Sequence, residues 1–198
     1  MRTVRTLAGC VIAGACVPVV ALASMSQIDR ERLVAHLQMT ASWLSDEVSS
    51  LSQEQLAYRS APGRWTVAEV VEHLVIAEPE YWKLFQDGLT HPAQELKNKA
   101  SDADVLWYGI DRTRHDKTEA RKDPQGQKIN ISEALTRFAK MHATMLAYAT
   151  ATTDDLRGHT VPEWGVDAYQ CLLEISTHEQ RHILQIREIK AAPGFPKH

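Results

Sequence analysis

Four stretches of this chain carry apolar residues at alternating spacings of three and four, which is the period of an α-helix with one buried face. They span residues 28–51, 66–84, 130–149 and 166–190. The second opens with a capping box from Thr66 to Glu69, and Pro193 follows the last. We find no convincing strand pattern and no internal repeat. The pattern predicts an all-α protein, most economically a four-helix bundle.

The segment of residues 91–127 interrupts this periodicity. It is polar, and it carries two adjacent aromatic residues, Trp107 and Tyr108. A connection of this length in a small domain is usually functional or lacks fixed structure. Within it, residues 111–123 mix basic and acidic side chains, and we expect a solvated loop or a short exposed helix there. We expect the loop that carries the two aromatic residues to cover a pocket.

The first residues differ from the rest of the chain. A positive start is followed by an apolar run over residues 7–20 and by small residues up to Ala23. This order is typical of a cleavable secretory signal peptide, here residues 1–23, which leaves a mature domain of residues 24–198. An uncleaved membrane anchor is the alternative, because the run approaches the shortest length that spans a bilayer. With cleavage, we expect an exported protein, periplasmic or secreted, that does not stay in the membrane.

Composition and charge limit the classes of binding partner and the cross-links that this chain can have. The chain has 198 residues, enough for one sizeable core, and a formal net charge of −3. Its 22 Lys and Arg residues form no basic stripe, so we expect no nucleic-acid partner. After removal of the signal peptide Cys171 is the single cysteine, so no internal disulfide framework can form. We expect Cys171 to be a small buried core residue.

Three histidines lie on the buried stripes of two predicted helices. His178 and His182 are four residues apart in the last helix, which places their rings on one face, about 6 Å apart along the axis. His73 lies on or beside the buried stripe of the second helix. Polar rings that face a core need partners, and a shared divalent cation would satisfy all three. Three imidazoles leave coordination positions open, and zinc or nickel is the expected ion, with iron and copper as alternatives.

Polar residues flank these histidines on the last helix. Glu174, one turn before His178, is a candidate to accept a hydrogen bond from that ring. Gln185, one turn after His182, is a candidate to bind metal-bound water or substrate. Glu179 is a candidate general base. Its helical angle, however, points it to the side of the histidine face, which favours a surface or interhelical salt bridge.

Two other conspicuous residues are better explained by packing. Trp65 precedes the cap of the second helix and fixes where that helix starts. His142 faces the core from the third helix, so we expect a buried, hydrogen-bonded ring. We assign neither to the metal site.

The segment from His178 to His182 also matches the HExxH signature of zinc proteases, in which the glutamate is the general base. Only sixteen residues follow His182, which leaves no room for the usual downstream ligand helix. Glu188 stands where a third ligand could lie, but Gln185 replaces the glycine that such a turn needs. A zinc protease is therefore a minor alternative.

The segments "APGRWTVAEVVEHLVIAE" and "HEQRHILQI", with the spacing between them, resemble the DinB/YfiT-like superfamily, most closely its DinB_2-type members. The similarity covers nearly the whole mature chain. It implies a four-helix bundle with one long crossover, and a metal held by one histidine of the second helix and two of the last. By position, those ligands are His73, His178 and His182.

The resemblance also implies a range of activities, since its relatives look like thiol-dependent transferases and isomerases or amide hydrolases, and many have no known activity. We expect a divalent-metal protein that acts on a small molecule as a hydrolase or group transferase, and a homodimer is compatible with such a bundle. The alternative is a non-catalytic, stress-related binding module whose metal is structural or vestigial.

Overall fold

The computed structural model describes residues 25–91, 96, 100–114, 119–125 and 129–197. The predicted signal peptide lies outside the described residues. Within them, no helix is both long and apolar enough to cross a membrane. The molecule is built on four long helices: α1 (Gln27–Val48), α3 (Val67–Leu89), α5 (Ile131–Ala151) and α6 (Ala168–Lys190).

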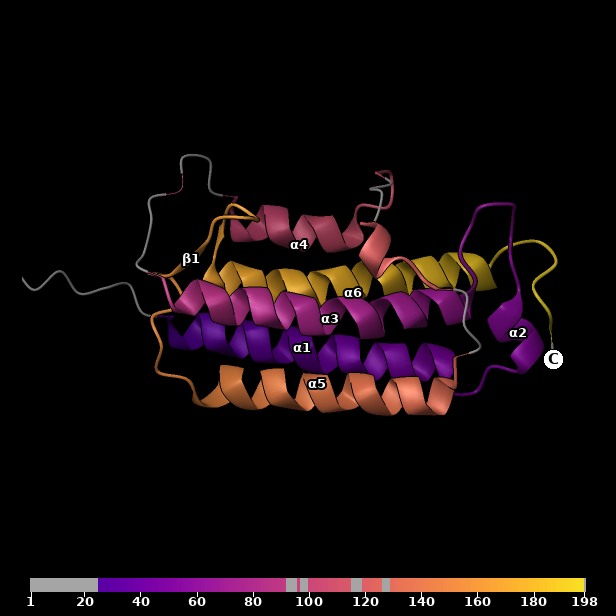
Figure 1. The fold of residues 1–198 in the computed structure, drawn as a ribbon, viewed down its shortest axis with the longest axis horizontal. Helices are drawn as coiled ribbons and strands as arrows, with labels where there is room; N and C mark the ends of the chain where they lie inside the picture. The colour runs from indigo at the N-terminus through magenta and orange to yellow at the C-terminus, as the bar shows by residue number, and fades with distance from the viewer. Residues whose placement is uncertain (1–24, 92–95, 97–99, 115–118, 126–128, 198) are drawn as a thin grey trace, which may run out of the picture.

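The four long helices form a bundle in which α1 and α3 each pack against both α5 and α6. In Figure 1, α1 and α6 run in one direction and α3 and α5 in the other. Because α3 and α5 are parallel, the chain between them must return along the length of the bundle. The predicted helical bundle is confirmed, and this return connection is its long crossover.

Side-chain caps fix the starts of the two helices that carry the candidate histidines. The Thr66 hydroxyl accepts a hydrogen bond from the backbone N–H of Glu69 at 3.1 Å, and the Glu69 carboxylate accepts one from the Thr66 N–H at 2.7 Å. Asp167 and Gln170 form the equivalent pair at the start of α6. These bonds satisfy N–H groups that a helix start leaves unpaired. They set the rotation of the first turns of α3 and α6.

The crossover holds a helix that the sequence analysis did not predict. This helix, α4 (Asp102–Ile110), packs on α6, and the short 3₁₀ helix η1 (Ala120–Lys122) follows it. Gly109 makes the approach of α4 to α6 close, because a Cβ atom there would stand 2.9 Å from the carbonyl oxygen of Thr177. The sequence analysis expected a loop at Trp107 and Tyr108, whereas both lie on α4, a packed helix that buries Val105 and Gly109.

Short elements complete the fold. A single-turn helix, α2 (Gln53–Ala57), precedes α3. Two strands of two residues each, β1 (Thr160–Val161) and β2 (Val166–Asp167), pair antiparallel just before α6. The sequence analysis predicted no strand, because a two-residue strand is too short to show an alternating pattern.

The core consists of two hydrophobic clusters with polar residues between them. One cluster includes Leu33, Leu37, Met145, Leu172 and Ile175. The other includes Leu44, Leu74, Phe138, Ile183 and Ile186. Among the buried polar residues, one from each long helix belongs to a connected group between the clusters: Thr40, Glu78, His142 and Glu179. We call these four residues the polar layer.

Candidate metal centre

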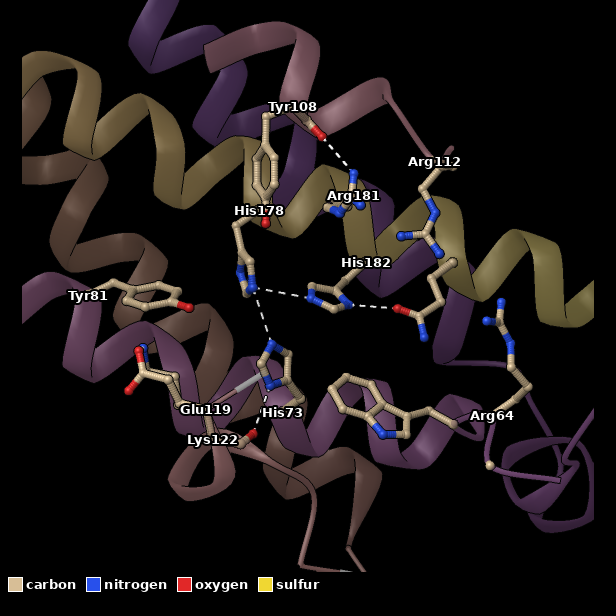
Figure 2. A pocket seen from close by; sticks show the side chains of 13 residues that line it. Arg64, His73, Tyr81, Tyr108, Arg112, Glu119, Lys122, His178, Arg181 and His182 are labelled. Atoms are coloured by element: carbon tan, nitrogen blue, oxygen red, sulfur yellow. Dashed lines mark hydrogen bonds and ion pairs between the residues drawn. The ribbon is translucent and has the colours of Figure 1, made fainter. Parts of the chain in front are cut away.

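The three predicted histidines converge between α3 and α6. The Nε2 atom of His178 lies 3.2 Å from the Nε2 atom of His73 and 3.2 Å from that of His182. One ligand nitrogen of each ring lies within 4.8 Å of the other two. Figure 2 shows the three rings turned toward one another. The fold thus brings His73 to its partner His178 across 105 positions of sequence.

This donor set fits a divalent transition metal. In a tetrahedral site with metal–nitrogen bonds of about 2.0–2.1 Å, two nitrogen atoms stand about 3.3–3.4 Å apart. The two Nε2–Nε2 separations of 3.2 Å are close to that spacing. Three imidazoles would leave a fourth position for water or substrate. Nothing in the donor set separates zinc from nickel.

Hydrogen bonds on the far side of two rings select the tautomer that a metal needs. The Nδ1 atom of His73 donates to the backbone carbonyl of Lys122 at 2.8 Å, and Nδ1 of His182 donates to Oε1 of Gln185 at 2.9 Å. Because these oxygens only accept, Nδ1 carries the hydrogen and the lone pair of Nε2 faces the common point. Gln185 therefore orients His182, and because it also lines the pocket its contact with metal-bound water or substrate stays a prediction.

Burial keeps the three rings neutral. It lowers the pKa of His73, and it lowers the pKa of His178 and His182 well below the ordinary value. For the last two, repulsion from the neighbouring rings and from nearby cations adds to the effect of burial. A neutral ring is the form that binds a metal, so all three are ready to bind one at neutral pH.

The histidines line a pocket of about 320 Å³. Figure 2 shows the side chains around it, which come from α3 and the residues just before it, from α4 and the segments that follow it, and from α6. Four of its lining residues are cationic and one is acidic. They are Arg64, Arg112, Lys122 and Arg181, with Glu119 as the acid.

The cations are held in place by different means. Arg181 is buried and donates to the backbone carbonyls of Tyr108, at 3.1 Å, and of Asp111 and Arg114. Backbone carbonyls carry no net charge, so the positive charge of Arg181 is not neutralised by these bonds. Lys122 pairs with Glu119 at 2.9 Å and also lies over the ring of Tyr81, while Arg112 pairs with Glu188 at 3.0 Å. The pocket therefore carries a positive surplus beside the histidines.

Two aromatic predictions need correction. Trp65 does not only pack at the start of α3: it lines the pocket, and its ring centroid lies 5.0 Å from that of His73. Of the two aromatic residues expected to cover the pocket, Tyr108 lines it, whereas Trp107 is 62% exposed. Neighbouring residues of a helix point about 100° apart, so α4 can direct only one of them inward.

Glu174 lies near His178 but not in the expected role. The structure gives no hydrogen bond between them, and Nδ1 of His178 is buried with no partner among the described residues. Glu174 lines a smaller cavity of about 120 Å³, which shares His178, Tyr81 and Tyr108 with the main pocket. Burial raises the pKa of Glu174 to about 7. It can therefore hold or release a proton near neutrality, close to the histidines.

Glu179 does not line the pocket. It is completely buried on the other side of α6, where Oε1 lies 2.6 Å from Nε2 of His142 and Oε2 accepts from the hydroxyl of Thr40 at 2.6 Å. Of the two interpretations of Glu179, the structure supports the interhelical contact. It gives no support to a role as general base, because the carboxylate does not reach the pocket. His142 is buried and hydrogen-bonded, as predicted.

Cys171 is buried with a free thiol, as predicted, and burial raises its pKa well above the ordinary value. The sequence analysis did not identify the four cations of the pocket. Arg181 had one signal, its position directly before His182. No feature of the sequence pointed to Arg112 or Lys122. Both reach the pocket from the crossover, where the sequence has no helical periodicity that would place them.

Comparisons with known proteins agree with this geometry. In a search of solved structures, the chain is similar to YfiT from Bacillus subtilis, described as a probable metal-dependent hydrolase with an unusual four-helix bundle topology. The TM-score is 0.58 at 20% identity, and the match covers 88% of this chain and 93% of that one. No curated protein matches the sequence. The sequence profile of the DinB superfamily, DinB_2, matches residues 32–186, and the chain therefore belongs to this superfamily.

Proposed function

We propose that this protein is an exported, metal-dependent hydrolase of a small molecule that carries a carboxylate or phosphate group. The observation that carries the proposal is the convergence of His73, His178 and His182 at a pocket with a surplus of cationic side chains. The description of YfiT as a probable metal-dependent hydrolase supports the reaction class.

Each part of the pocket has a role in this proposal. His73, His178 and His182 hold the divalent ion, and Lys122 and Gln185 fix the orientation of two of the rings. When bound, such an ion supplies a Lewis acid and lowers the pKa of water to about 7. Glu174, with its pKa of about 7, exchanges a proton with the reacting groups through the smaller cavity.

The substrate class follows from charge and size. Arg64 is placed to bind an anionic group, since guanidinium groups bind carboxylate and phosphate oxygens in pairs, whereas Arg112 already binds both oxygens of Glu188. A volume of about 320 Å³ is at the lower end of the range for small-molecule pockets. These features support a compact anionic substrate and speak against a polypeptide, as does the position of Glu179 away from the pocket.

Hydrolysis can be tested with purified mature protein. Elemental analysis gives the bound metal, and a panel of carboxylate and phosphate esters and amides, each with a neutral analogue, gives the substrate preference. We expect hydrolysis that is lost in His178→Ala and kept in His91→Ala, an exposed histidine outside the pocket. Added thiol separates group transfer, which consumes the thiol, from hydrolysis. A stoichiometric metal with no turnover on any substrate would favour the non-catalytic module.

The substrate charge can be tested separately. Arg64 is exposed and lines the pocket, so Arg64→Gln removes a charge without opening the core. We expect KM to rise for the anionic substrates and to stay unchanged for their neutral analogues. Equal changes for both would contradict an anionic substrate.

Export rests on the N-terminal sequence. Expression of the full chain in a Gram-negative host, followed by fractionation and mass measurement, should give a periplasmic protein that lacks residues 1–23. A cytoplasmic protein of full length would contradict this part of the proposal and leave the chemistry untouched.

A further inference from the structure

The polar layer is a feature that the proposed reaction does not use. Thr40, Glu78, His142 and Glu179 are between 0% and 4% exposed, and each replaces an apolar residue on the buried stripe of its helix. Polar side chains at one level of all four helices interrupt the hydrophobic core completely, which is unfavourable unless they bind one another or a ligand.

One carboxylate of the layer accepts no hydrogen bond. Glu179 is satisfied by His142 and Thr40, each at 2.6 Å. Glu78 is 1% exposed, and no described residue donates a hydrogen bond to its oxygens. Its hydrogen-bonding contact is with the Glu179 carboxylate, which requires a proton between the two groups. The Oε1 atom of Glu78 lies 4.0 Å from Nε2 of His142, too far for a hydrogen bond. Two buried carboxylates thus face one imidazole.

We propose that the polar layer is a second divalent-cation site, held by Glu78, His142 and Glu179. One donor atom of each residue lies within 4.8 Å of the other two. The separations of 2.6 and 4.0 Å from Nε2 of His142 to the two carboxylates bracket the spacing of about 3.3 Å between ligands of a small divalent ion. A divalent cation also balances the charge of two carboxylates.

The donor set differs from that of the pocket and so predicts a different preference. Two carboxylates with one imidazole suit manganese, iron(II) or zinc, whereas three imidazoles favour zinc, nickel or copper. Bundle proteins place metal sites in this way, with carboxylates and histidine projecting inward from facing helices. No residue is shared between the two groups, so each can bind its ion independently.

Hydrogen bonds already hold one ligand of the second site. The hydroxyl of Thr40 donates to Glu179 and lies 3.1 Å from the hydroxyl of Ser176, which in turn lies 2.6 Å from Nδ1 of His36. This chain links a partly exposed residue of α1 to the carboxylate. Such contacts fix the orientation of metal-binding carboxylates.

A groove gives access to the site. A cavity of about 340 Å³ between α3 and α5 is lined by Glu78, together with Arg137 and Lys140. The two cations repel an arriving metal ion, so loading should be slower here than at the three histidines. Incubation times must be long enough for equilibrium.

Metal stoichiometry tests the proposal. Mature protein stripped with chelator is incubated with Mn²⁺ or Zn²⁺, dialysed, and analysed for metal per chain. We expect two equivalents of Zn²⁺ in the parent protein, one in Glu78→Gln and one in the double variant His73→Ala/His178→Ala. Glu80→Gln changes a carboxylate of the same helix outside both groups and should keep two equivalents.

The double variant keeps the test decisive if Glu78→Gln folds poorly. Without the histidines, Mn²⁺ should still bind, raise the midpoint of thermal unfolding and lose its isotropic solution EPR signal as the ion becomes immobile. One equivalent in the parent protein and none in the double variant would overturn the second site. Glu78 would then carry a proton, consistent with its pKa, which burial and the nearby Glu179 carboxylate raise. That outcome would leave the three-histidine centre standing.

Discussion

Two adjacent residues of α6 belong to different sites. His178 faces the pocket with His73 and His182, while Glu179 faces the bundle axis with His142 and Glu78. In the first group Nε2 of His178 lies 3.2 Å from Nε2 of each other ring, and a cavity of about 320 Å³ lies in front of them. The second has unequal separations of 2.6 and 4.0 Å and is enclosed by four helices. One helix turn can thus serve an open centre on one face and a closed one on the other.

The two proposed sites differ in their access to a cavity. Chemistry on a substrate requires open coordination positions beside a pocket, which the three histidines provide, whereas the second group is buried in the core. The HExxH spacing cannot separate these cases, because it records only that two histidines share a helix face. The glutamate between them belongs to the protease mechanism only if it reaches the same ion, and here it is directed to the core.

Loss of a histidine ligand should have the largest effect. His178 contacts both other rings, so His178→Ala removes one ligand and the link between the remaining two. Loss of a residue that merely orients a ligand costs about 10–100-fold in metal affinity, so loss of the ligand itself should exceed 100-fold. Titration with Zn²⁺ measures this in stripped Glu78→Gln protein, where the proposed second site adds no equivalent of its own, with His91→Ala as control. An unchanged Zn²⁺ affinity would show that the three histidines hold no metal.

The two carboxylates of the polar layer should respond differently in metal-free protein. Glu179→Gln breaks a buried pair with His142 and should lower the free energy of unfolding by about 3 kcal/mol. Burial and the Glu179 carboxylate raise the pKa of Glu78, so Glu78→Gln replaces a neutral carboxyl by a neutral amide and should change the free energy of unfolding by about 1 kcal/mol or less. Urea unfolding of both variants in chelator measures the difference. Equal losses would mean that Glu78 is as well satisfied as Glu179.

Glu174 gives a pH dependence on the pocket side of α6. Its pKa is about 7 in the folded protein against an ordinary value of 4.5, so the folded state holds the proton more tightly. The stability that this provides is complete below pH 4.5 and is lost as the pH rises through 7. Relative to Glu174→Gln, the parent protein should lose about 3 kcal/mol of unfolding free energy between pH 4.5 and 8. Parallel stability curves for the two proteins would show that Glu174 is solvated.

The sequence predicted the site residues that lie on periodic helix stripes and missed those that do not. The stripes placed His73, His178 and His182 on facing helices, and the resemblance of their flanking segments gave the same three residues. The hydrogen bond that orients His73 could not be predicted, because its acceptor is the backbone carbonyl of Lys122. Every residue has such a carbonyl, so the sequence carries no sign of it. The positive pocket was missed for a related reason, because Arg112 and Lys122 lie on the crossover.

The polar layer was visible in the sequence but only in part. His142 was recognised on a buried stripe, yet Glu78 and Thr40 occupy equivalent positions on theirs and were not connected with it. A single polar residue in a stripe is usually satisfied locally. Four at one level become significant only when the order of helices around the bundle is known, and the sequence does not give that order.

The smallest effect is expected from a substitution in α4, Gly109→Ala. It should affect the pocket and leave the polar layer unchanged. Alanine at Gly109 gains about 1 kcal/mol of helix propensity, but its Cβ atom would stand 2.9 Å from the Thr177 carbonyl, and such overpacking costs about 1–3 kcal/mol. We expect a net loss of about 1 kcal/mol and a displacement of α4 from α6. Tyr108 and Arg112 line the pocket from this region, so KM should rise several-fold. Metal binding in the polar layer, whose residues lie on the other helices, should not change.

Leu106→Ala, on the exposed face of the same helix, is the control and should change neither KM nor metal binding. If Gly109→Ala altered the stoichiometry at the core site, the two sites would be coupled through α6 and the separation argued above would be wrong.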